Sequence, residues 1–139
     1  MLRLVSPMTL LMAMFVVMAA AGCAGTQTSS SGLGVAIPIT DLKAIAGKWS
    51  GRASRLTSDV DDWLEVTLHD DGTFEAFSAK QIGVFRDKGT LTLSGGKVAA
   101  AGSHGMAVLT LYDRRGPVLV IDATEANGVK HSADLRPEM

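Results

Sequence analysis

Apolar and polar side chains alternate with a period of two through most of the chain beyond its first third. In the segment WLEVTLH, the side chains of Leu64, Val66 and Leu68 fall on one face. Trp63 falls on the opposite face and is expected to point outward. Successive side chains of a β-strand point to opposite faces, so this alternation predicts strands with one buried face. Strands are predicted from Lys48 and at 63–69, 74–80, 83–85, 90–93, 106–113, 117–123 and 129–135, and a ninth segment, 97–101, can form one more.

Short turn sequences separate these segments and decide how the strands pair. Turns containing glycine are predicted at DDGT (70–73), RDKG (86–89), RRG (114–116) and EANG (125–128). Consecutive strands joined by short connections are antiparallel, because a parallel crossover needs about a dozen residues or more. The chain is therefore predicted to be all-β, a small antiparallel up-and-down (meander) barrel of about eight strands. A two-sheet sandwich is the alternative.

A short helical turn is predicted at residues 40–47, immediately before the first strand. Thr40 can serve as the N-cap, Asp41 suits the positive end of a helix, and Gly47 can end it. The turn therefore leads directly into the segment Gly47-Lys48-Trp49.

This segment resembles the G-x-W signature of the lipocalins and their calycin relatives. In that family the signature opens strand one, and its tryptophan packs across the closed end of the barrel. The resemblance implies a lipocalin-like β-barrel domain over residues 37–139, in which Gly47 and Trp49 carry the fold signature.

Residues 1–22 have the composition of a signal peptide. Arg3 supplies a positive charge, LLMAMFVVMAAA (10–21) is the apolar region, and small residues follow. A transmembrane helix that stays in place is the alternative, but residues 4–21 reach only the lower limit of about 18 residues for a span. No Lys or Arg follows until Lys43, so the cleaved signal is favoured.

Cys23 is the only cysteine in the 139 residues. AAGC at 20–23 resembles the lipobox of bacterial lipoproteins, in which the signal is cut before a cysteine that then carries lipid. The resemblance implies a lipid anchor on Cys23, and Ala24 after it implies sorting to the outer membrane, facing the periplasm. An ordinary secretory signal with a free thiol is the alternative. Residues 23–36 are rich in Gly, Ser and Thr and are predicted to form a flexible tether.

The sequence contains few residues in patterns typical of metal-binding or catalytic sites. The net charge of −1 provides no basic field, so no nucleic-acid partner is expected. His69, His104 and His131 lack the spacing of metal ligands, and the acidic runs at 59–62 and 70–71 lack the loop of an EF-hand. Turn and strand-edge roles explain both runs. Ser103-His104 lacks an orienting third group and an oxyanion hole. No metal, no cofactor and no enzymatic activity are therefore expected.

The interior of a small barrel either fills with side chains or holds one small ligand. Two functions follow. The first is a non-catalytic binding module for a small apolar ligand or an acyl chain, and the second is an envelope lipoprotein with a solid barrel that docks another envelope protein. Trp63, on the outer face, is the candidate partner surface. The candidate ligand-lining residues are Leu64, Val66, Leu68, Leu91, Leu93, Leu109 and Leu111.

Overall fold

A computed structural model describes residues 34–55, 61–80 and 83–139. In this part of the chain the strands are β1 (Val35–Ile37), β2 (Gly47–Arg55), β3 (Asp61–Leu68), β4 (Thr73–Lys80), β5 (Gly83–Ser94), β6 (Lys97–Gly102), β7 (Gly105–Asp113), β8 (Pro117–Glu125) and β9 (Lys130–Pro137). A 3₁₀ helix, η1, spans Leu42–Ala44. The predicted signal peptide and Cys23 lie outside the described residues. The last two residues of the predicted tether, Val35 and Ala36, lie in β1.

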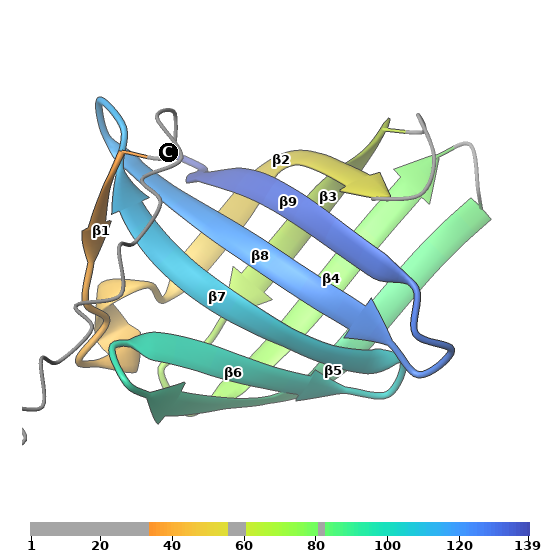
Figure 1. The fold of residues 1–139 in the computed structure, drawn as a ribbon, viewed down its shortest axis with the longest axis horizontal. Helices are drawn as coiled ribbons and strands as arrows, with labels where there is room; N and C mark the ends of the chain where they lie inside the picture. Colours follow the sequence, from red (N-terminus) through yellow and green to blue (C-terminus); the bar gives the residue numbers. More distant parts are fainter. Residues whose placement is uncertain (1–33, 56–60, 81–82) are drawn as a thin grey trace, which may run out of the picture.

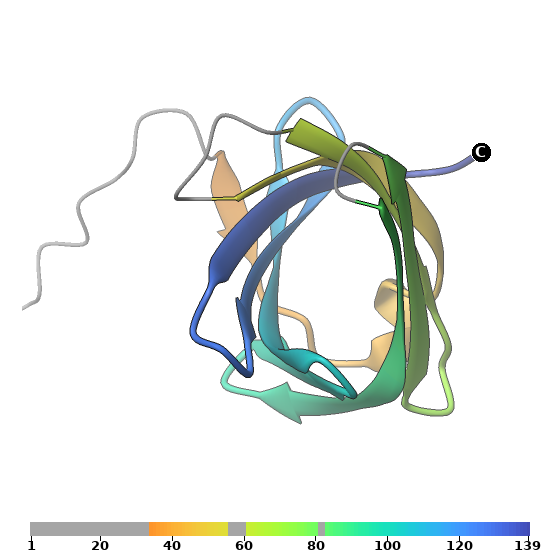
Figure 2. The ribbon, with the colours of Figure 1, turned by 90° about the vertical axis from the view of Figure 1, so that its right-hand side faces the viewer.

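The strands close into an antiparallel barrel. Strands β2 to β9 pair in chain order, and β9 pairs back with β2, which completes a ring of eight strands (Figures 1 and 2). The closing pair runs from Trp49 opposite Pro137 to Arg55 opposite His131. This ring confirms the predicted meander barrel and excludes the two-sheet sandwich.

Strand β1 is an addition to the barrel that the sequence pattern did not predict. It pairs with the end of β7, where Ile37 lies opposite Leu111. The pairing of β7 with β6 extends only from Met106 to Leu109. The short β1 therefore covers the edge of β7 beyond the last residue that β6 pairs.

The predicted turn at 86–89 is wrong, because β5 runs straight through it as one strand of 12 residues. Within it, Asp87 pairs with Ala76 of β4, and Gly89 pairs with Gly102 of β6. A Cβ atom on Gly89 would lie 1.9 Å from the carbonyl oxygen of Ala101. This glycine therefore permits a close approach of two strands and does not reverse the chain. The ninth segment does form a strand, β6, so the barrel keeps eight strands.

Large side chains close one end of the barrel. The helix η1 lies at this end, on the left in Figure 1, and its N-cap is Asp41 rather than the predicted Thr40. Gly47 then begins β2 with a φ of +127°, a conformation that favours glycine. Trp49 is 4% exposed, and its Nε1 donates a 2.8 Å hydrogen bond to the carbonyl oxygen of Ile45. The tryptophan thus ties the first barrel strand to the segment that covers the end.

Candidate functional site: a cavity at the open end of the barrel

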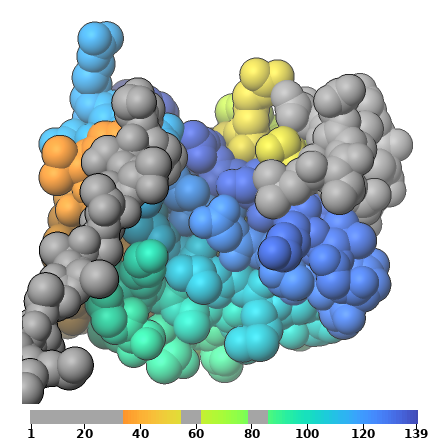
Figure 3. Space-filling model, viewed as in Figure 1, coloured from red at the N-terminus to blue at the C-terminus, as the bar shows by residue number. Residues whose placement is uncertain are grey.

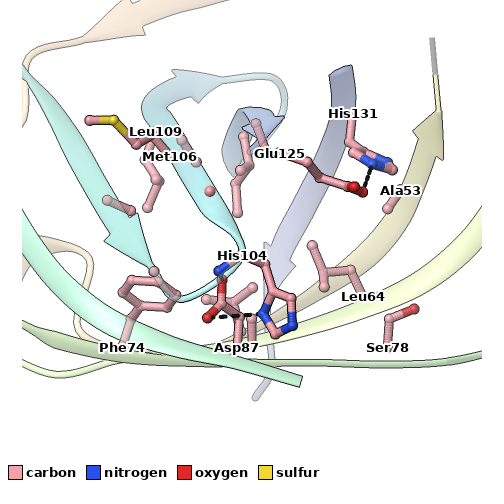
Figure 4. Close-up of a pocket in the computed structure, with 18 of the residues that line it drawn as sticks. Ala53, Leu64, Phe74, Ser78, Asp87, His104, Met106, Leu109, Glu125 and His131 are labelled. Carbon is pink, nitrogen blue, oxygen red and sulfur yellow. Dashed lines mark hydrogen bonds and ion pairs between the residues drawn. The ribbon is translucent and has the colours of Figure 1, made fainter. Parts of the chain in front are cut away.

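Away from Trp49, the barrel encloses a cavity of about 180 Å³. Small residues on neighbouring strands leave this space unfilled, among them Ala76, Ala100, Ala107 and Ala123. Figure 4 shows the cavity with side chains from several strands around it. Its apolar wall is completed by larger side chains, which are Leu64, Val66, Leu68, Phe74, Leu91, Met106, Leu109 and Ile121.

The side of the barrel is closed over this space. In Figure 3 the atoms of β7, β8 and β9 form a continuous wall over the middle of the visible face. The order of the inner-face residues along each strand shows which end of the cavity is polar. On β3 these residues run from Leu68, which lies opposite Gly47 near the closed end, to Asp62. On β8 they run from Ile121 to Glu125. The polar groups therefore gather at the end opposite η1.

The structure brings together five of the seven predicted lining residues. Leu64, Val66, Leu68, Leu91 and Leu109 all contact the cavity. The other two lie closer to the closed end.

Leu93 is 41% exposed, because it lies at the end of β5, beside the turn to β6. Leu111 belongs to the hydrophobic core, 8% exposed, and pairs with Ile37 and Leu119. Neither is among the residues that line the cavity. Both fall on the predicted inner face, but the alternation does not tell how far along the barrel the open space extends.

Asp87 anchors the connection between β6 and β7 at the cavity. Its Oδ1 accepts hydrogen bonds from the amide (2.8 Å) and the hydroxyl (2.6 Å) of Ser103 and from the Lys88 amide (2.8 Å). Its Oδ2 accepts a longer one, 3.4 Å, from the His104 amide. Burial of Asp87 raises its pKa, but the hydrogen bonds from Ser103, Lys88 and His104 outweigh this effect and hold the pKa below its usual value.

This cluster does not have the geometry of a nucleophile and its base. The Ser103 hydroxyl donates to the Asp87 carboxylate, whereas His104 Nδ1 lies 3.4 Å from the hydroxyl oxygen. A nucleophilic serine needs its hydroxyl proton directed at a base that a third group orients. Here the carboxylate holds the connecting loop in place. A side chain on Gly102 would collide with it, because a Cβ atom there would lie 2.2 Å from Asp87 Oδ2.

A second polar pair, Glu125 and His131, faces the cavity from β8 and β9 (Figure 4). The imidazole Nε2 of His131 contacts Oε1 of Glu125, and both side chains are mostly buried. Asn127 in the intervening turn donates to Oε2 of the same carboxylate at 3.0 Å. The pair therefore links two strands across their turn at the open end.

Asp62 is the third carboxylate on the cavity wall. The residue is 8% exposed, and its Oδ1 has no hydrogen-bond partner. It lies on β3, on the same face as Leu64 and Val66. The predicted turn or strand-edge role does not describe this residue, because it lies buried on the inner face of β3. Extending the alternation of 63–69 back by two residues from Leu64 would have placed Asp62 inside the barrel.

Trp63, the neighbour of Asp62, points away from the cavity and is 43% exposed. The strand pairing places it opposite Arg52 on the outer face of the barrel. Within residues 34–55, 61–80 and 83–139, no group of three or more His, Cys, Asp or Glu side chains is arranged to hold a metal ion. In the same ranges no helix is long and apolar enough to cross a membrane.

Comparisons of the chain with protein-family models, with curated proteins and with solved structures found no match.

Proposed function

We propose that this protein is a non-catalytic binding module that holds a small apolar molecule, or one end of an acyl chain, in the open end of its barrel. The observation that carries the proposal is the 180 Å³ cavity with a largely apolar wall. Such a pocket with a few polar groups at its edge is the usual form of a small-molecule site. The covered end at Trp49 gives the cavity a floor, so a ligand enters from the polar end.

The volume limits the size of the ligand. An engineered apolar cavity of about 150 Å³ is large enough to bind benzene, whereas drug-sized ligands occupy pockets of about 300–1,000 Å³. The cavity of about 180 Å³ therefore suits one ring or a short alkyl segment. A longer acyl chain fits only if most of its length stays outside the barrel.

A titration with 1-hexanol tests this proposal directly. We expect amide NMR signals of the inner-face residues Val66, Leu91 and Leu109 to shift in a saturable way. Signals of the outer-face residues Thr67 and Thr92 serve as the control and should remain in place. Equal shifts on both faces, or no shift at millimolar hexanol, would contradict a binding cavity.

We further propose that the module is an envelope lipoprotein with a lipocalin-like barrel, anchored to a membrane through lipid on Cys23. The lipobox-like AAGC at 20–23 and the Gly, Ser and Thr content of residues 23–36 support this. The expected location is the outer membrane, facing the periplasm. Metabolic labelling with a palmitate analogue should mark the wild type and not Cys23→Ser, because only the thiol can carry the lipid. An unlabelled wild type would end this part of the proposal.

A solid interaction module is the second candidate, and the exposure of Trp63 favours it. Exposed aromatic side chains frequently anchor protein interfaces. This candidate predicts that no apolar probe binds the barrel and that added volume inside it is destabilising. Attention would then move to Trp63 and its neighbour Arg52 on the outer face.

A further inference from the structure

Three carboxylates face the cavity, those of Asp62, Asp87 and Glu125. No lysine or arginine lies on the cavity wall within the described part of the chain, and the other titratable groups there are His104 and His131. The wall therefore carries an excess of acidic groups when the histidines are neutral. A ligand in the cavity would lie beside this negative charge.

Two of the three carboxylates already have partners. Asp87 accepts four hydrogen bonds from the residues beside it, and the pKa of Asp87 is lowered accordingly. Glu125 contacts the imidazole of His131 and accepts from Asn127. Their interactions hold the loops at the open end, which explains their presence without a ligand.

Asp62 has no such explanation. The residue is more than nine-tenths buried, and its Oδ1 is buried and unpartnered. Buried polar groups in folded proteins are nearly always hydrogen-bonded, because an unpaired one loses its hydration and gains nothing in return. For a carboxylate this cost is larger still. A carboxylate on the cavity wall with an unpartnered oxygen therefore indicates that a partner arrives from outside the chain.

We infer that the ligand carries a protonated amine, which pairs with the Asp62 carboxylate while its hydrocarbon part lies against Leu64 and Val66. This inference rests on the proposed function, since it names the class of ligand for the same cavity. An ammonium group suits this carboxylate better than a hydroxyl does, because it adds the attraction between opposite charges to the hydrogen bond that either group can donate. A fatty-acid carboxylate would add a further negative charge beside Asp62, so free fatty acids are disfavoured.

The geometry of β3 supports a ligand with two chemically different ends. Asp62, Leu64, Val66 and Leu68 follow each other on one face of the strand, from the polar end of the cavity toward its floor. A short alkylammonium ion can therefore place its charge at Asp62 and its chain along the leucine and valine side chains.

The experiment compares three probes that share one alkyl chain: hexylammonium, 1-hexanol and hexanoate. Binding is measured by NMR titration, read on the inner-face amides of Val66 and Leu109. We expect hexylammonium to bind about tenfold more tightly than hexanol, because its charge attracts the Asp62 carboxylate in addition to the hydrogen bond that both probes can donate. Hexanoate is expected to bind most weakly of the three.

Substitution of Asp62 tests whether this side chain is the cause of the preference. In Asp62→Asn and in Asp62→Leu the ratio of hexylammonium to hexanol affinity should fall to about one. Glu65→Gln is the matched control, because it removes a carboxylate from the outer face of the same strand. This control should retain the tenfold ratio. Far-UV circular dichroism establishes that each variant is folded, and the wild-type ratio is decisive even if a variant is not.

The outcomes separate this inference from the proposed function. If hexanol and hexylammonium bind the wild type equally, the amine inference is wrong and the apolar cavity stands. If Asp62→Asn keeps the preference for the amine, the inference is also wrong, because another carboxylate then provides it. If none of the three probes binds, the proposed function itself fails.

Discussion

The two ends of the barrel are built from the same eight strands but from different side chains. At the closed end, Ile39, Ile45 and Trp49 are at most 4% exposed, and Trp49 has its hydrogen bond satisfied. At the open end, alanines and glycines leave a cavity, and Asp62 has an unpartnered oxygen. Tight packing of the closed end contributes stability, whereas the open end forgoes contacts that it could have made.

In this small fold, one end of the barrel contributes stability and the other end leaves space in the interior. A domain in which every inner position was filled would gain stability and have no room for a ligand. Functional sites commonly depart from the best packing and from full hydrogen bonding, and the rest of the fold compensates.

The largest effect is expected at the closed end. Trp49→Ala should reduce the free energy of unfolding by about 3–5 kcal/mol, because it empties a large buried site. It also leaves the Ile45 carbonyl oxygen without its donor. Urea unfolding followed by far-UV circular dichroism measures this loss. The matched control is Trp63→Ala on the outer face, which should cost less than about 1 kcal/mol. Equal losses for the two variants would remove the assigned role of Trp49.

Leu68 and Leu64 lie on the same face of β3, one near the closed end of the barrel and one near the open end. Substitutions of these two residues therefore compare the two ends. Leu68 is 2% exposed near the floor of the cavity, whereas Leu64 is half-buried at the open end. Leu68→Ala should cost about 2–5 kcal/mol, the usual range for a buried leucine. Leu64→Ala should cost about 1 kcal/mol, because part of its surface already lacks packed neighbours. A larger loss for Leu64→Ala in urea unfolding would contradict the contrast between the ends.

Substitution of Asp87 should have a smaller effect on the free energy of unfolding, and this effect should depend on pH. Its pKa in the folded protein is below its usual value of 3.8, so the ionised carboxylate stabilises the fold above that pH. The contribution is lost as the pH falls through the lowered pKa. At pH 7, Asp87→Asn should cost about 1–2 kcal/mol, because its amide group would face the donors of Ser103.

Urea midpoints of the wild type and of Asp87→Asn should therefore converge as the pH is lowered below about 4. Asp122→Asn is a suitable control, because Asp122 is exposed and its carboxylate accepts from Ser132 on the outside of the barrel. A difference between wild type and Asp87→Asn that stays constant down to pH 2 would show that the charge of Asp87 is not involved.

Much of the barrel could be predicted from the sequence because alternation is a local signal. The segment WLEVTLH places Leu64, Val66 and Leu68 on the inner face, as the structure shows. The predicted turn at 86–89 failed for a non-local reason. Aspartate and glycine, here Asp87 and Gly89, are residue types typical of turns. Asp87, however, accepts a hydrogen bond from the amide of Ser103, 16 residues away. Ala101 of β6 approaches the glycine.

The polar part of the candidate site was harder to predict. Asp62 stands in an acidic run that is typical of a solvent-exposed loop, and only its phase with Leu64 indicates the inner face. Glu125 and His131 flank a turn, and their contact depends on the register of β8 and β9. Likewise, β1 forms through a pairing with Leu111 and Tyr112, far along the chain. No local pattern marks these contacts between strands.

If the open end of the barrel contains space for a ligand, one added side chain should fill it. Val66→Phe adds a ring inside the cavity, whereas Thr67→Phe adds the same ring to the outer face of the same strand. The measurement is saturable binding of 1-hexanol to the wild type and to both variants, together with their urea midpoints. We predict binding by the wild type and by Thr67→Phe, no binding by Val66→Phe, and little change in the stability of either variant. A wild type that binds no hexanol, with a Val66→Phe variant destabilised by about 1–3 kcal/mol as in an overpacked core, would show instead that the barrel interior is solid.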